Sequence, residues 1–163
     1  MRCLTLTQPW ASLVAIGAKR IETRSWGTNY RGPLAIHAAK GFAALPGGNL
    51  TDFCLNEPFG SALFAGGIRK LVPGEDLPLG KVIAVGTLVT CIPLDDGPTV
   101  RDALILSDAP HEREFGDYAV GRFAWILADV RPLPAPIPAR GSLGLWEWAA
   151  PADVLALLPK GGV

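Results

Sequence analysis

The sequence predicts an α+β fold, a small mixed β-barrel of five to six strands with short peripheral helices. Nineteen glycines and fifteen prolines among 163 residues favour short elements joined by many turns. The expected strands and helices also follow one another at irregular intervals, without the strand–helix alternation of a parallel sheet. We expect one domain over residues 1–163, a length at which a single hydrophobic core is usual.

The chain opens with a predicted strand and a short helix. Residues 2–6 alternate apolar and polar side chains, as a half-buried strand does. Thr7 or Gln8 precedes the helix as a possible cap, Pro9 suits its first turn, and Gly17 ends it. One face of this helix is apolar and is formed by Trp10, Leu13 and Val14. We therefore expect a two-turn helix packed on the sheet.

Two further strands are predicted in the first forty residues. At 20–26, Ile21, Thr23 and Ser25 lie on one face of the strand. The charged residues and a tryptophan share the other face: Arg20, Glu22, Arg24 and Trp26. A turn at 29–32 leads into a strand at 33–38. His37 points away from the apolar side of that strand, and we expect a structural histidine there.

The middle of the chain predicts two helices and two long strands. Short helices are expected at 51–56 and 61–65. Residues 81–91 are β-branched and nearly uncharged, which is typical of a buried strand. A helix is expected at 99–107, and a long strand with alternating polarity at 118–131.

The C-terminal region begins with proline at every second position. Residues 131–138 must therefore be extended and lack several hydrogen-bond donors. We expect a stiff connector, the alternative being a ligand for a proline-reading partner. A last strand is predicted at 145–148 and a short helix at 151–158.

The net charge of the chain is zero, with fifteen basic and fifteen acidic residues. This balance argues against a protein that coats a polyanion without regard to sequence. Residues 1–40 nevertheless hold six basic residues and one carboxylate, a net charge of +5. Residues 75–117 hold three basic residues and nine carboxylates, a net charge of −6. Such asymmetry favours one local site for an anionic ligand.

Neither a metal nor a cofactor is expected. The three cysteines, Cys3, Cys54 and Cys91, belong to no metal-ligand spacing, and His37 and His111 are the only histidines. The apolar run at 82–94 is too short for a membrane span, and the N-terminus lacks the apolar stretch of a signal peptide. We therefore expect a cytoplasmic protein with no membrane partner.

The candidate site lies in residues 8–26. Lys19 follows the helix, and Glu22 and Arg24 share a strand face. Two cations beside a carboxylate suit a phosphate or the polar edge of a base, and Trp10 or Trp26 offers a stacking surface. The alternative is an ordinary Glu22–Arg24 ion pair beside two core tryptophans.

These residues resemble the ASCH domain family. The resemblance rests on Gln-Pro-Trp-Ala-Ser at 8–12, Gly-x-Lys-x-x-Glu-x-Arg-x-Trp at 17–26, and Tyr-Arg-Gly-Pro-Leu-Ala-Ile-His-Ala-Ala-Lys at 30–40. Weaker similarities lie at 80–85, 121–125, 136–138 and 141–146. The resemblance implies a PUA-like barrel that binds RNA or a modified nucleotide in a cleft beside the first helix.

The family pattern implies specific site residues. Lys19, Glu22 and Arg24 would line the cleft, and the helix would add Gln8, Trp10 and Ser12. The wider candidate set is completed by Trp26, Arg31 and Lys40. Arg122 and Arg140 are further candidates for a second basic side, although we expect them to pair with the acidic middle region instead.

Two other functions stay open. The first is hydrolysis of a modified nucleoside or of RNA, with Lys19 and Glu22 as catalytic groups. Amidohydrolases that resemble this chain carry Thr where Glu22 stands, and use a later carboxylate that the strand at 82–91 lacks. The second is a protein-interaction module of a transcription or translation factor, which would use the proline-rich segment or the acidic middle; its protein partner is unknown.

Overall fold

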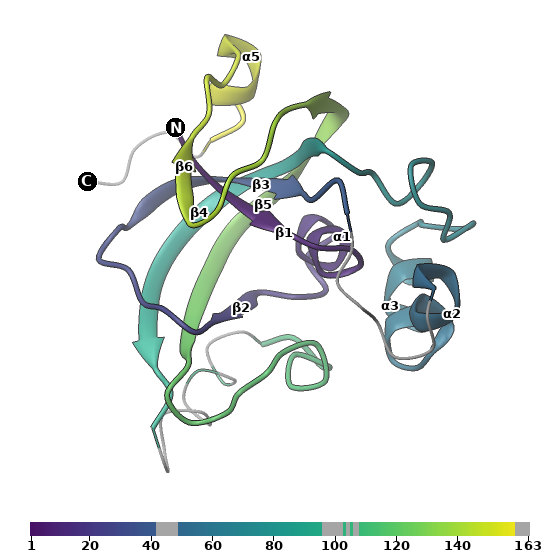
Figure 1. The fold of residues 1–163 in the computed structure, drawn as a ribbon, viewed down its shortest axis with the longest axis horizontal. Coiled ribbons are helices and arrows are strands. Elements are labelled where there is room, and N and C mark those ends of the chain that lie inside the picture. The colour runs from purple at the N-terminus through teal and green to yellow at the C-terminus, as the bar shows by residue number, and fades with distance from the viewer. Residues whose placement is uncertain (42–48, 96–102, 104, 106–107, 159–163) are drawn as a thin grey trace.

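Six strands form one curled sheet around a central helix (Figure 1). The computed structural model describes residues 1–163 except 42–48, 96–102, 104, 106–107 and 159–163. The strands are β1 (Arg2–Leu6), β2 (Ile21–Arg24), β3 (Gly32–Ala38), β4 (Lys81–Pro93), β5 (Phe123–Pro138) and β6 (Leu145–Glu147). The helices are α1 (Trp10–Ala15), α2 (Leu50–Leu55), α3 (Phe59–Ala65) and α5 (Ala152–Leu155).

The sheet is mixed, and its order is β2-β5-β4-β3-β1-β6. β1 and β3 run parallel, whereas every other neighbouring pair is antiparallel. β4 and β5 curve strongly, so that the sheet forms a half-barrel with short helices beside it (Figure 1). The predicted α+β fold, a small barrel of five to six strands, is confirmed.

Helix α1 packs against four strands, β1, β3, β4 and β5. Leu13 and Val14 are fully buried, as the apolar face of the predicted helix requires. Gly17 takes φ = +79°, a conformation that glycine adopts without strain, and turns the chain toward β2. Gln8 anchors the helix start, because its Oε1 accepts a 3.1 Å hydrogen bond from the Ser12 N–H and its Nε2 donates one of 2.9 Å to the Pro78 carbonyl.

The proline-rich segment corrects one prediction. Residues 131–138 are extended as expected, but they are the second half of β5 and pair with β4 from Val85↔Arg131 to Lys81↔Pro138, so they are not a connector. β2 pairs with residues 123–126 of β5, so that among the described strands the proline half has a neighbour, β4, on one side only. Proline is tolerated at such an edge, where no ladder donor is needed.

The start of β5 was also predicted too early. Residues 118–122 form a turn, with Gly121 at φ = +85° and the Arg122 N–H bonded to the Ala119 carbonyl, so that the strand begins at Phe123. The other predicted strands and helices are confirmed within a few residues, except the helix at 99–107, most of which lies outside the described residues. In the described part of the chain, every helix falls short of the length and apolar character that a membrane crossing requires.

Candidate nucleic-acid site

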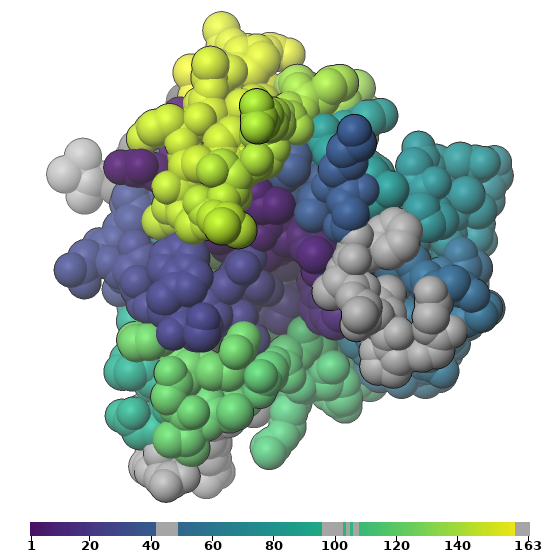
Figure 2. All heavy atoms as spheres, in the orientation of Figure 1, coloured from purple at the N-terminus to yellow at the C-terminus, as the bar shows by residue number. Residues whose placement is uncertain are grey.

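A cavity of about 710 Å³ opens between α1, β2 and the segment 114–117. Figure 2 shows a hollow at the centre of one face, with N-terminal residues at its base and residues of the later chain along its rim. Residues from every third of the sequence line it, including Thr5–Thr7, Glu22–Arg24, Phe53, Phe59, Arg122 and 142–144. The sheet therefore gathers distant segments around one opening.

One wall of the cavity is aromatic. It consists of Trp10 from α1, Phe53 from α2, Phe59 from α3 and Phe115. The ring centroids of Trp10 lie 5.6 Å from Phe53 and 6.1 Å from Phe59, and Phe59 lies 5.1 Å from Phe115. These spacings are typical of packed aromatic clusters. The wall is thus a preformed surface on which a planar ligand can stack.

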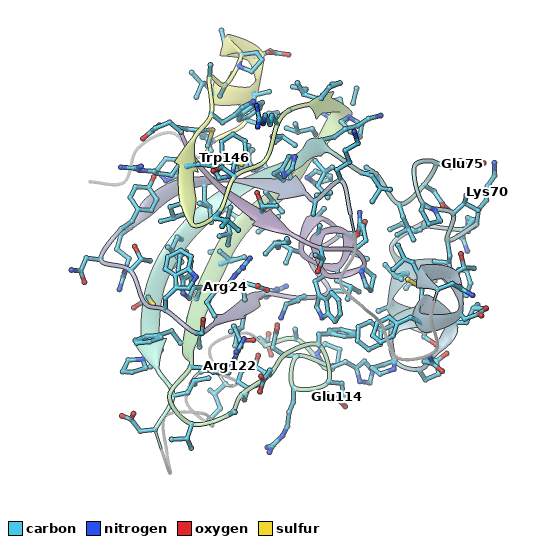
Figure 3. All side chains as sticks on the ribbon, viewed as in Figure 1. Arg24, Lys70, Glu75, Glu114, Arg122 and Trp146 are labelled. Atoms are coloured by element: carbon cyan, nitrogen blue, oxygen red, sulfur yellow. The ribbon has the colours of Figure 1, made fainter. Side chains whose placement is uncertain are left out.

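Arg24 forms part of the polar wall. Its Nη2 donates a 2.6 Å hydrogen bond to the Thr5 carbonyl, and its Nε lies 3.0 Å from Oε1 of Glu22, an ion-pair distance without the alignment of a hydrogen bond. In Figure 3 the side chain of Arg24 extends from β2 toward β1. Arg24 therefore links two strands that are not neighbours in the sheet, and holds Glu22 at the cavity.

Arg122 supplies the second cation of the lining. Its Nη2 donates to the Thr23 carbonyl over 3.1 Å, and its Nε lies 3.3 Å from Oδ2 of Asp117. The pairing with the acidic middle region matches the sequence-based expectation for this residue. Arg122 nevertheless also lines the cavity. It therefore pairs with the acidic middle region and adds a cation to the candidate site at the same time.

The lining carries charges of both signs. In the described part of the chain, Arg24 and Arg122 are its cations, and Glu22, Glu114 and Asp117 are its carboxylates. The basic N-terminal region is therefore not gathered here. Of its six basic residues, Arg24 alone borders this cavity.

Lys19 lies behind the cavity, with a side chain only 1% exposed. Its Nζ contacts the Ile21 carbonyl and lies 3.6 Å from Oε1 of Glu112 and 4.0 Å from Oε2 of Glu22. A buried ammonium needs such partners, because its loss of hydration is costly. Lys19 therefore contacts Glu22 from the side away from the cavity and is not part of the cavity lining.

Glu112 completes this buried cluster. The backbone N–H groups of Arg20 and Ile21 donate to its carboxylate over 2.6 and 3.1 Å. Burial raises the pKa of Glu112, and the nearby Lys19 and the two N–H donors counteract part of that effect. Glu112 is only 2% exposed, although a carboxylate within the charged run 111–114 would ordinarily be expected at the surface. Its neighbours in sequence carry no periodic apolar pattern that would have revealed this burial.

The other expected site residues occupy different places. Gln8 and Ser12 are buried and bond to each other at the start of α1. Trp26 packs edge-to-face on Trp125 at 4.7 Å, outside the cavity lining. Arg31 is exposed and donates to the neighbouring Thr28 and Tyr30 carbonyls. Only Trp10, Glu22 and Arg24 of the expected set line the cavity.

A second cavity, of about 970 Å³, adjoins the first. The two share Thr5, Ala39, Ser142 and Leu143 in their linings. The second is bordered by Lys40, Lys81 and Arg140, together with His37. Lys40 of the expected set lies here, as does Arg140, the further candidate for a second basic side.

His37 holds one wall of the second cavity in place. Its Nε2 lies 3.1 Å from the Ala139 carbonyl and must carry the proton, since a carbonyl only accepts. Its Nδ1 has no hydrogen-bond partner among the described residues. Burial lowers the pKa of His37, so the neutral ring is favoured. The expected structural role agrees with these contacts.

In the described part of the chain, no group of three or more His, Cys, Asp or Glu side chains is arranged to hold a metal ion. Cys3, Cys54 and Cys91 are unpaired thiols, and burial raises the pKa of Cys3 to about 12 and that of Cys54 to about 11. Cys3 and Cys54 therefore stay protonated and unreactive near neutral pH.

Comparison with known proteins identifies relatives of this chain. The family model of the ASCH domain matches residues 4–131. Activating signal cointegrator 1 of Mus musculus is 30% identical over 148 residues, which cover 89% of this chain and 22% of that protein. The Homo sapiens protein of the same name is 29% identical over 148 residues, which again cover 89% of this chain and 22% of that protein. The chain thus spans about a fifth of the length of these curated relatives.

Proposed function

Since this chain belongs to the ASCH domain family, which is generally thought to bind RNA, we propose that it binds RNA and holds one base in the cavity beside α1. The observation that carries the proposal is the aromatic wall of Trp10, Phe53, Phe59 and Phe115 next to the polar groups of β2. The cavity of about 710 Å³ is within the usual range for small-ligand pockets, about 300–1,000 Å³.

The aromatic wall favours a base as the group that enters. Unstacked bases of single-stranded RNA bind on aromatic side chains, and each such contact contributes about 1–3 kcal/mol. Trp10 is half-buried and lines the cavity, so part of its side chain is accessible to a ligand. Its contacts with Phe53 and Phe59 hold the ring in place, which reduces the entropy lost on binding.

The polar groups would select among bases. Carboxylates accept hydrogen bonds from the amino groups of bases, and Glu22 and Asp117 offer such oxygens. Arg24 and Arg122 would donate to ring nitrogens or carbonyl oxygens. Three carboxylates in the lining disfavour a phosphate in this cavity, because like charges repel in a partly desolvated space.

Lys19 acts indirectly in this proposal. Its ammonium holds Glu22 and Glu112 beneath β2, so it positions a cavity residue without touching the ligand. Gln8 and Ser12 contribute by fixing the start of α1 and with it Trp10. Trp26 and Arg31 support the surrounding loops and would not contact the base.

The proposal is tested by fluorescence anisotropy with labelled hexaribonucleotides of each single base. We expect Trp10→Leu to weaken binding by about 1–3 kcal/mol, roughly five- to 150-fold. Arg24→Gln should weaken it as well and change the ranking of the four bases. The control is Arg31→Gln, which removes one exposed cation outside the cavity and should retain nearly all the affinity. Equal binding by wild type, Trp10→Leu and Arg24→Gln would refute the proposal.

Hydrolysis of a modified nucleoside or of RNA is the second candidate function. It is favoured by Glu22, which lies at the cavity with the Lys19 ammonium 4.0 Å from its carboxylate. A carboxylate placed in this way can act as a general base on a water molecule. Glu22→Gln should then abolish turnover of acylated nucleosides or labelled RNA. The absence of product with wild-type protein would exclude this activity for the substrates tried.

A further inference from the structure

We propose that the second cavity binds the phosphodiester backbone of the RNA strand whose base occupies the first. This inference rests on the proposed function and extends it, because it makes the ligand a single strand longer than one nucleotide. The groups that would contact phosphate are Lys40, Lys81 and Arg140.

The two cavities differ in charge. The first has two arginines and three carboxylates in its lining. Among the described residues, the lining of the second contains two lysines and one arginine and neither Asp nor Glu. Phosphate groups bind where Lys and Arg gather without competing carboxylates, and such contacts supply most of the affinity for a nucleic-acid backbone. The charges thus separate a base site from a phosphate site.

The two cavities also meet at a common border. Thr5, Ala39, Ser142 and Leu143 line both, so the two cavities lie side by side with only these residues between them or along their common edge. A nucleotide carries its base and its phosphate on opposite sides of the sugar. A strand that places a base against Trp10 can therefore place a neighbouring phosphate beside Lys40 and Arg140.

The border is held rigidly. The Thr5 hydroxyl donates to the Ser142 carbonyl over 3.1 Å and accepts from Trp146 Nε1 over 3.0 Å. His37 lies edge-to-face on Trp146, a residue of β6 that is labelled in Figure 3, and donates to the Ala139 carbonyl. These bonds fix residues 139–142 before any ligand arrives. A preformed surface of this kind loses little conformational entropy on binding.

The test removes two exposed cations of the second cavity in the double variant Lys40→Ala/Arg140→Ala. Lys81 stays, since it is partly buried within β4. The matched control is Arg69→Ala/Lys70→Ala, which removes one arginine and one lysine from an exposed turn outside both linings. Each protein is titrated with the four ribonucleosides and with the four homohexaribonucleotides, over a salt series.

We expect the double variant to bind hexanucleotides at least tenfold more weakly at low salt than wild type or the control. The dependence of log K on log salt should become shallower by about 1.4, because each lost single-strand phosphate contact contributes about 0.7. Nucleoside affinity should stay at the wild-type value, since nucleosides carry no phosphate.

Other outcomes separate the possible failures. If the double variant retains hexanucleotide affinity and salt slope while Trp10→Leu still weakens binding, the phosphate site is wrong and the base site stands. If wild-type protein binds neither nucleosides nor hexanucleotides, both proposals are overturned. Hexanucleotides with a 5′-hydroxyl and with a 5′-phosphate should bind equally; binding that requires the 5′-phosphate would replace the backbone by a terminal phosphate and overturn the inference.

Discussion

The ammonium of Lys19 lies 3.6 Å from the carboxylate of Glu112, and each side chain is 1% exposed. This pair joins the turn before β2 to a segment far along the chain that also lines the candidate site. The position of β2 at the cavity thus depends on a buried ionic contact. Its strength can be measured separately from any ligand.

Lys19→Met should destabilise the protein by about 3 kcal/mol or more, because it leaves the Glu112 carboxylate buried without its cation. Adding Glu112→Gln should recover part of this loss, since a neutral amide tolerates burial better. The measurement is urea unfolding of the two single variants and the double variant. Lys40→Met, at an exposed position, should change the unfolding free energy by less than about 0.5 kcal/mol. Additive single effects would show that the two groups do not interact.

Stability should fall as the pH drops below 6.5, and His37 should account for part of the decrease. Its pKa in the folded protein is lowered from 6.5, chiefly by burial. Between that pKa and 6.5 the unfolded chain binds more protons, so the stabilisation present above pH 6.5 is lost as the pH falls. The slope from one such group is at most about 1.4 kcal/mol per pH unit.

Urea unfolding of His37→Gln between pH 5 and 7.5 checks this expectation. The variant should show a shallower decrease than wild type, whereas His111→Gln, at an exposed position, should retain the wild-type slope. Glu112, whose raised pKa contributes with the opposite sign, is present in all three proteins. Identical slopes in wild type and His37→Gln would contradict the assignment.

Leu143→Ser should weaken RNA binding without changing stability. Leu143 is 96% exposed and lies in the lining of both cavities, so the free protein gains almost nothing from it. A strand that crosses the border would cover part of the side chain, and the loss should be about 1 kcal/mol, roughly fivefold in affinity. Val120→Ser, 60% exposed and outside both linings, is the control. Unchanged affinity in Leu143→Ser would place the strand elsewhere.

Gly141→Ala should destabilise the protein by about 1–3 kcal/mol. A Cβ at this position would lie 2.5 Å from Cε1 and 2.7 Å from Nδ1 of His37, and the ring is held by Ala139 and Trp146. Thermal unfolding measures the effect. Gly41→Ala should be nearly neutral because nothing lies within 4 Å of its Cβ position. In the double variant Gly141→Ala/His37→Ala the clashing ring is gone, so the loss of stability should be smaller than the sum of the losses in the two single variants. Additive losses would show that Gly141→Ala does not act through a clash with His37.

Much of the fold follows from local sequence patterns. Alternating polarity places Ile21 and Thr23 inside and Glu22 and Arg24 outside, because adjacent side chains of a strand point to opposite faces. Gly17 ends α1 for reasons of backbone conformation alone. The proline run was misread for a non-local reason: whether an extended segment is a connector or an edge strand depends on its neighbour, here β4.

The candidate site also has a part that the sequence reveals and a part that only the fold brings together. Its N-terminal part, Trp10, Glu22 and Arg24, is visible in the sequence because these residues lie within two adjacent elements. Phe53, Phe59, Arg122 and Leu143 join them only through the folded sheet, and no short-range pattern indicates that contact. Glu112 is the clearest example, since a charged residue among other charged residues is expected at the surface until its partner is known.

Charge shows where sequence information ends. The chain alone establishes that its zero net charge combines a basic N-terminal region with an acidic middle. Folding then distributes the basic residues: Lys19 goes to a buried pair, Arg24 to the aromatic cavity and Lys40 to the cationic one. Summed charge is a property of composition, whereas the potential at a site depends on which charges lie within a few ångströms, and only the packing of distant segments sets those distances.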